Sequence, residues 1–131
     1  MKKTPLLHRG LSQLVAGLGH GDLVVIADAG LPVPDGTPCI DLALTRGVPS
    51  FDEVLRVLLS EMQVERAALA EEALQRSPAF VAQAGERLQG VPLERVPHDE
   101  LKRRSASARA IVRSGEFTPY ANLLLYAGVV F

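Results

Sequence analysis

The histidine at position 20 is the first residue of the chain that could carry out chemistry. Gly19 and Gly21 give its imidazole little cover, so we expect the ring to face a cleft or another subunit. An imidazole titrates near neutral pH and can pass protons to and from the oxygen atoms of a small molecule. A surface histidine or a capping histidine is the alternative that these residues leave open.

Asp28 is the second candidate, because it directly follows the apolar residues 23–27. A carboxylate at the end of a buried strand is costly unless something uses the charge. It could bind a ligand, or it could cap the following loop through an Asx turn. The sequence leaves these two roles equally open.

Four further residues have polar groups suited to holding a small molecule. His98 and Lys102 are four residues apart and so share one helix face, where they could hold a hydroxyl or an anion. Tyr120 and Asn122 place a phenol and an amide two residues apart before an apolar strand, an arrangement that suits a sugar. Helix-start and turn residues of the same types are the ordinary alternatives, and the basic residues 102–104 usually form a solvated face.

The elements that must position these residues alternate between helix and strand. Residues 23–27 are too few for a buried helix and predict an interior parallel strand, and turn formers at 29–36 predict a long loop after it. Ser50 and Glu53 match a capping box, and Ser77 with Pro78 predicts another helix start. The other signals predict helices at 11–18, from 50 to about 62, from 77 to 90 and from 98, and strands at 93–96, 110–113, 122–126 and 129–131. Residues 40–44 form a second short apolar segment. Residues 64–70 have helix-favouring Ala and Glu, but their position after one helix and before another helix start favours a strand.

This alternation predicts an α/β fold: a single three-layer α-β-α domain over residues 1–131 with a mostly parallel central sheet. In such sheets ligands bind beyond the carboxyl ends of the strands, which is where Asp28 and its loop lie. With 131 residues the chain can bury roughly two-thirds of its unfolded surface, so a second domain is not expected.

Composition and charge exclude several classes of partner. Fourteen Lys and Arg against fifteen Asp and Glu give a net charge of −1, which provides no positive field for nucleic acid or anionic lipid. No stretch has the length and apolarity of a membrane span. Cys39 is the only cysteine, which suits a reducing compartment, and we expect it to be a small core residue in a cytoplasmic protein.

Metal and nucleotide sites are not predicted. The three histidines and the cysteine have no metal-ligand spacing. The glycines around His20 precede a strand instead of linking a strand to a helix, so they are not a phosphate-binding loop.

Several blocks of the chain, taken together and in order, resemble the D-ribose pyranase family. Each is weak alone, but jointly they are specific and extend over essentially the whole chain. Related fucose mutarotases have Tyr-Gly-Asn where this chain has Tyr120-Ala121-Asn122. The blocks are Gly19-His20-Gly21-Asp22, Asp28-Ala29-Gly30-Leu31-Pro32, residues 44–51, residues 61–65, residues 113–116 and Pro119-Tyr120-Ala121-Asn122.

The resemblance implies an isomerase that interconverts the pyranose and furanose forms of D-ribose without a metal or organic cofactor. It implies that His20 is the catalytic proton donor and that the sugar is bound by Asp28, His98, Lys102, Tyr120, Ala121 and Asn122. It also implies a homo-oligomer, a decamer of two stacked pentameric rings. The base that takes the second proton is either Asp28 or His98.

Strand geometry adds an expectation of its own. An extended strand over 23–27 separates His20 from Asp28 by roughly 17 Å at about 3.3 Å per residue, too far for one sugar to touch both within a chain. We therefore expect a site shared between neighbouring subunits. A non-catalytic sugar-binding accessory module of ribose uptake, a mutarotase for another sugar such as fucose, and a phosphosugar isomerase are the competing functions.

Overall fold

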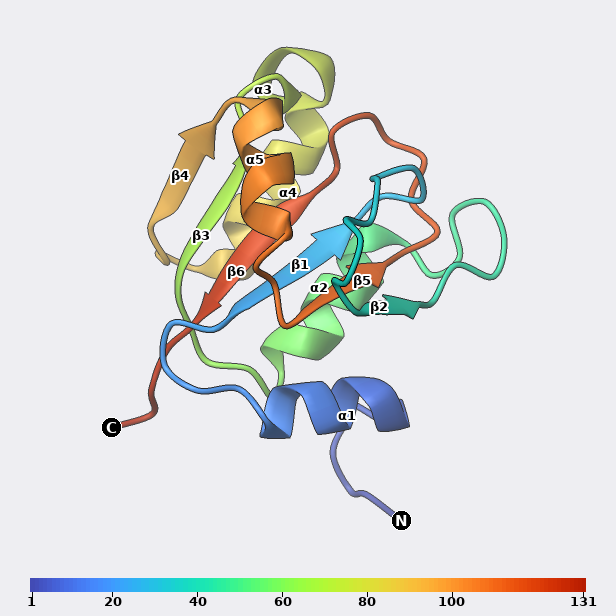
Figure 1. Cartoon of the computed structure of the whole chain (residues 1–131), viewed down its shortest axis with the longest axis vertical. Helices are drawn as coiled ribbons and strands as arrows, with labels where there is room; N and C mark the ends of the chain where they lie inside the picture. The colour runs from blue at the N-terminus through green and yellow to red at the C-terminus, as the bar shows by residue number, and fades with distance from the viewer.

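Six strands form the centre of the structure, a computed structural model that describes all residues from 1 to 131 (Figure 1). Their order in the sheet is β2-β5-β1-β6-β3-β4. β1 pairs parallel to β5, β5 to β2 and β3 to β4, whereas β6 pairs antiparallel to both β1 and β3. The mostly parallel sheet is confirmed, with β6 the one reversed strand. The strands are β1 (Leu23–Ala27), β2 (Cys39–Asp41), β3 (Val64–Ala70), β4 (Leu93–Val96), β5 (Ala110–Arg113) and β6 (Leu123–Ala127).

Helices cover both faces of this sheet, which confirms the three-layer α/β fold. Val24 and Ile26 of β1 pack with α1, α2 and α4, while Val25 points to the face covered by α5 and Leu31. None of the helices combines the length and apolar character needed to cross a bilayer. The helices are α1 (Arg9–Ala16), α2 (Phe51–Leu59), α3 (Ala73–Arg76), α4 (Pro78–Leu88) and α5 (His98–Ser105).

The starts of α1, α2 and α4 differ in how their side chains are bonded. The capping box is confirmed: Ser50 Oγ accepts from the Glu53 amide, and the Glu53 carboxylate accepts from the Ser50 amide. His8 caps α1 by accepting from the Leu11 amide at 3.2 Å, which the sequence did not indicate. Ser77 is not a side-chain cap of α4 as predicted, because its hydroxyl instead donates to the Pro119 carbonyl at 2.6 Å. The start of α4 is thereby tied to the segment before β6.

Three other expectations are wrong in detail. No strand forms at 129–131: β6 ends at Ala127, and the last residues lie exposed with no neighbouring strand to pair with. Helix α2 ends at Leu59, not near 62, because the chain turns there to enter β3. Cys39 is exposed, not buried, because β2 is a three-residue strand at the edge of the sheet and pairs only with β5.

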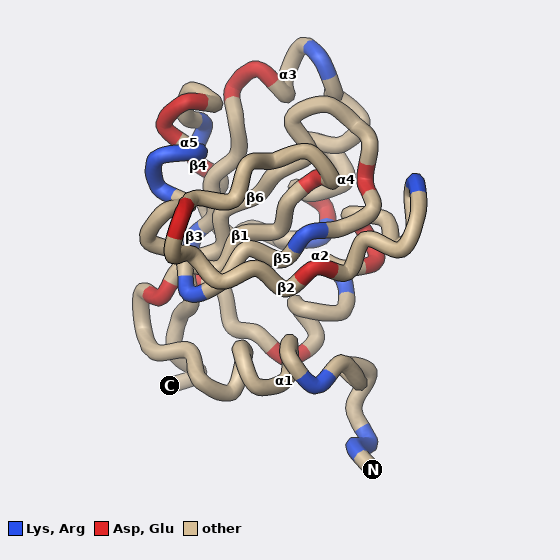
Figure 2. The backbone as a smooth tube through the Cα atoms, turned by 45° about the vertical axis from the view of Figure 1, so that its right-hand side comes forward, with Lys and Arg blue, Asp and Glu red and all other residues tan.

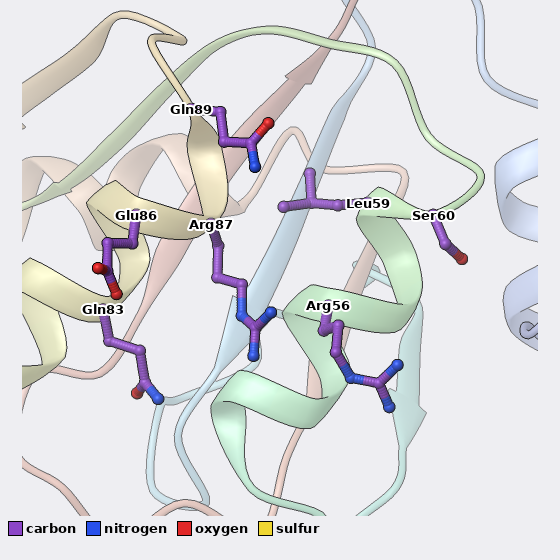
Figure 3. Close-up of a pocket in the computed structure, with 7 residues that line it drawn as sticks. All are labelled: Arg56, Leu59, Ser60, Gln83, Glu86, Arg87 and Gln89. Carbon is purple, nitrogen blue, oxygen red and sulfur yellow. The ribbon is translucent and has the colours of Figure 1, made fainter.

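An ion pair joins α2 and α4, which cover the same face of the sheet. Arg87 extends from α4 toward α2 beside a hollow of about 480 Å³ that Arg56 and Gln83 also line (Figure 3). Its Nε and Nη2 atoms donate to the two oxygens of Asp52 at 2.8 and 2.6 Å. The hydrogen bond from Arg87 lowers the pKa of the Asp52 carboxyl below its ordinary value.

The Asp52→Asn variant should lose stability only where that carboxyl is ionised in the wild type. Because the folded-state pKa is lowered, the contribution is complete above the ordinary pKa of about 3.9 and is lost as the pH falls through the lower value. We expect a thermal midpoint a few degrees below wild type at pH 7 and a difference that shrinks as the pH is lowered toward 2, measured by circular dichroism. An equal difference at both pH values would contradict a role of the charge.

Candidate active site

The sheet topology divides the candidate residues between two opposite edges. The carboxyl ends of the parallel strands and the start of the reversed strand β6 meet at one edge. That edge carries Asp28 after β1, His98 after β4, and Tyr120 to Asn122 before β6. His20 precedes β1 and therefore lies at the opposite edge, as the predicted strand over 23–27 required.

Asp28 and Asn122 form a reciprocal pair at the first edge. The Asp28 amide donates to Asn122 Oδ1 at 2.9 Å, and Asn122 Nδ2 donates to Asp28 Oδ2 at 2.9 Å. Asp28 Oδ1 accepts from the Gly30 amide at 2.9 Å, so the Asx turn and the ligand-binding role are compatible. Asn122 is fully buried, and both of its side-chain polar atoms are used in the contacts with Asp28.

Tyr120 and His98 are brought together beside this pair. Their rings meet edge to face with centroids 5.0 Å apart. Tyr120 has a positive φ of 59°, which turns the chain sharply before the buried Ala121 and Asn122. The amide of His98 donates to both Glu72 oxygens, at 2.9 and 3.2 Å, so Glu72 holds the start of α5 at this edge. His98 Nδ1 is buried without a hydrogen-bond partner in the chain, which leaves a polar atom available to a ligand.

Lys102 lies one turn after His98 and pairs with Asp99 at 3.0 Å. The hydrogen bond from Lys102 lowers the pKa of the Asp99 carboxyl. The basic residues that follow it in the sequence are also paired, and in Figure 2 the basic part of α5 lies next to acidic segments. Arg103 contacts Glu100, Arg104 contacts Glu94 and Glu100, Arg109 contacts Asp22, and Arg113 contacts Asp41. The basic residues 102–104, together with Arg109 and Arg113, are therefore all engaged by carboxylates.

A hollow of about 350 Å³ opens in front of Asp28. Gly30, Phe117 and Pro119 are among the residues that line it. Its volume is within the range of about 300–1,000 Å³ usual for small-ligand pockets. Glu116 fixes the lining segment, because its carboxylate accepts from the Phe51 amide and from Thr118 Oγ1. A small polar molecule in this hollow would meet the Asp28 carboxylate.

His20 lies in a separate cleft of about 300 Å³ at the opposite edge, lined also by Leu18 and the C-terminal residues 128–131. Its side chain is 62 % exposed, as its glycine neighbours predicted, and Nε2 lies 2.6 Å from Glu65 Oε2. The loop that carries it is anchored by Asp22, which accepts from the Gly19 amide and from Arg109. Those two contacts lower the pKa of the Asp22 carboxyl.

The structure thus brings together Asp28, His98, Tyr120 and Asn122, with Lys102 one turn away, and it keeps His20 apart from them. Sequence reasoning missed Glu65 and Glu72, which contact His20 and the His98 amide. They are 45 and 26 residues away from these partners in the sequence, and no local motif predicts contacts over such separations. No group of three metal-ligating side chains is formed.

Comparisons with known proteins agree on one family. The profile of the RbsD/FucU transport protein family matches residues 1–130. A D-ribose pyranase of Variovorax paradoxus is 58 % identical over 133 residues, and one of Chloroflexus aggregans is 57 % identical over 131 residues, each with complete coverage of both chains. Among solved structures, Bacillus subtilis RbsD complexed with D-ribose is similar over both whole chains, with 44 % identity and a TM-score of 0.97. The fucose mutarotase of Streptococcus pneumoniae, with 24 % identity and a TM-score of 0.85, shares the fold.

Proposed function

Because this chain belongs to the RbsD/FucU transport protein family, we propose that its substrate is free D-ribose, since relatives with high identity to it carry the name D-ribose pyranase. It is an isomerase that interconverts the pyranose and furanose forms of ribose. The observation that carries this conclusion is the identity of 54–58 % to three D-ribose pyranases over the whole chain. The resemblance inferred from the sequence blocks is confirmed by these matches.

The reaction requires one acid and one base. A proton is delivered to the ring oxygen while another leaves the anomeric hydroxyl, so the bond between C1 and the ring oxygen breaks and an open-chain aldehyde forms. Closure through the other hydroxyl, at C4 instead of C5, returns both protons and gives the second ring size. His20 as an imidazolium supplies the first proton, and Asp28 or His98 accepts the second.

The residues at the carboxyl edge hold the sugar in this proposal. Both oxygens of Asp28 accept N–H bonds and still have lone pairs for a sugar hydroxyl. Tyr120 and the unpartnered Nδ1 of His98 supply directional hydrogen bonds that orient the ring. Lys102 contributes from the next turn of α5, and Ala121 and Asn122 keep Tyr120 and Asp28 in place.

The two edges of one sheet cannot close on one sugar, so a complete site needs two copies of the chain. We place His20 of one subunit against the Asp28 pocket of its neighbour. Exposed apolar residues at the C-terminus, Val130 and Phe131, lie beside His20 and suit burial between copies. A decamer of two pentameric rings in the cytoplasm is the assembly and location proposed, and the single cysteine suits that reducing compartment.

Exchange spectroscopy on ¹³C1-labelled ribose tests the function. In buffer the pyranose and furanose C1 signals exchange slowly, and catalytic amounts of the protein should add cross-peaks between them. A parallel sample with ribose 5-phosphate tests for a phosphosugar isomerase, which would convert this aldose into a ketose. The ribose spectra also distinguish an accessory module, which would bind ribose without adding exchange. Parallel samples with fucose test the mutarotase alternative.

A further inference from the structure

The contact between His20 and Glu65 carries an inference beyond the assignment of His20 as proton donor, on which it rests. We propose that Glu65 is a positioning residue for His20: its carboxylate binds Nε2–H, fixes the ring, and leaves Nδ1 as the nitrogen that donates to the sugar. The two side chains are 2.6 Å apart at Nε2 and Oε2, a close hydrogen bond between an imidazole and a carboxylate. Glu65 has no other side-chain partner.

The backbone places Glu65 there through an irregularity in β3. Val64 pairs with Ala127 and Arg66 with Tyr126, so Glu65 is an extra residue between two consecutive pairs of the β3 and β6 ladder. A bulge of this kind re-aims the side chain of the added residue. Next to it, Gly128 leaves the necessary room, because a Cβ there would lie 3.0 Å from the Glu65 Cβ.

The same strand end anchors the loop that carries His20. The Gly21 amide donates to the Ala127 carbonyl, and the Ala127 amide donates to the Asp22 carbonyl, both at 2.8 Å. The histidine loop and the glutamate bulge are therefore both tied to the end of β6. A side chain that is 62 % exposed, as His20 is, would otherwise sample several rotamers.

The chemical consequence concerns the two ring nitrogens. The hydrogen bond made by one nitrogen of an imidazole determines which nitrogen carries the proton in the neutral ring. With Nε2–H held by Glu65, neutral His20 has its lone pair on Nδ1, and imidazolium has its transferable proton there. The proton moves from Nδ1 to the ring oxygen, and a later proton returns to Nδ1. Without Glu65 the ring rotates and either nitrogen faces the sugar.

Removal of the carboxylate tests this role by two independent readouts. Glu65→Ala should lower kcat for ring exchange about 10- to 100-fold and leave KM for ribose within about threefold, because Glu65 does not touch the sugar. Glu65→Gln keeps an oxygen that accepts from Nε2–H and should recover most of the rate. Glu86→Ala is the matched control, since Glu86 lies on α4 (Figure 3) and lines neither the hollow in front of Asp28 nor the cleft of His20.

The second readout needs no activity. Long-range ¹H–¹⁵N correlation spectra of the His20 ring should give the Nε2–H tautomer in wild type and in Glu65→Gln, and a mixture of tautomers in Glu65→Ala. Wild-type kcat in Glu65→Ala, or His20 signals that Glu65→Ala leaves unchanged, would overturn the proposal, as would a Glu65→Gln variant as slow as Glu65→Ala. A wild type that does not speed ring exchange would instead refute the proposed function, and the spectra would still decide the contact.

Discussion

Replacement of His20 by alanine should slow protein-dependent ring exchange by about 10²- to 10⁴-fold, the range usual for loss of a general acid. The side chain is 62 % exposed and contributes nothing to either core cluster, so the fold should be unaffected. Ribose should still bind, because Asp28 and Tyr120 lie at the other edge of the sheet. The measurement is exchange spectroscopy at saturating ribose, with binding followed by calorimetry.

His8→Ala is the matched histidine control for that variant. His8 caps α1 and lies outside the site, so its loss should cost about 0.5–1 kcal/mol of stability and leave the exchange rate of the folded protein unchanged. If His20→Ala kept more than about a tenth of the wild-type rate, His20 would not be the general acid.

Asp28→Asn should reduce kcat/KM about 100-fold, since the site loses the carboxylate that faces the sugar in this proposal and the orientation of that group. The two oxygens of Asp28 accept from the Gly30 amide and from Asn122 Nδ2. An asparagine has only one oxygen, so its NH₂ group must face one of these donors. The lost bond should also reduce stability by about 1–2 kcal/mol, measured by urea unfolding.

A double variant, in which the residues at positions 28 and 122 are interchanged, separates the structural role of Asp28 from its chemical role. In Asp28→Asn with Asn122→Asp, the amide donates to the new carboxylate at 122 and its oxygen accepts from Gly30, so the three hydrogen bonds of the pair can form again. We expect stability to recover while activity stays low, because the carboxylate then lies at a fully buried position. Recovery of both would show that Asp28 acts only as a structural residue.

Local patterns in the sequence predicted most of the fold because the physical causes were local. Five apolar residues between acids could only be a buried strand, and Ser50 with Glu53 formed the capping box that their spacing indicated. The Ser77 cap failed because the hydroxyl found a distant carbonyl at Pro119, a contact that no local pattern contains. The predicted strand at 129–131 failed because strand pairing needs a neighbour, which propensity does not supply.

In the candidate site, too, some features follow from local sequence and others depend on contacts between distant segments. Residue types predicted Asp28, His98 and Tyr120 as candidates, and strand length predicted that His20 lies apart from them. The ring contact between His98 and Tyr120 and the Asp28–Asn122 pair depend on the reversal of β6 beside β1, which brings the residues before β6 to the carboxyl edge. Glu65 depends on a bulge in the register of β3, which has no signature in the residues themselves.

Mixed oligomers of two inactive variants test the central claim, a ribose ring held between His20 of one chain and Asp28 of another. His20→Ala and Asp28→Asn are unfolded together, refolded together in equal amounts, and compared with each variant refolded alone. Random assembly should give intact sites at about one quarter of the positions, and so about one quarter of wild-type ring exchange. A mixture no more active than its two parents would mean that each site is built within a single chain.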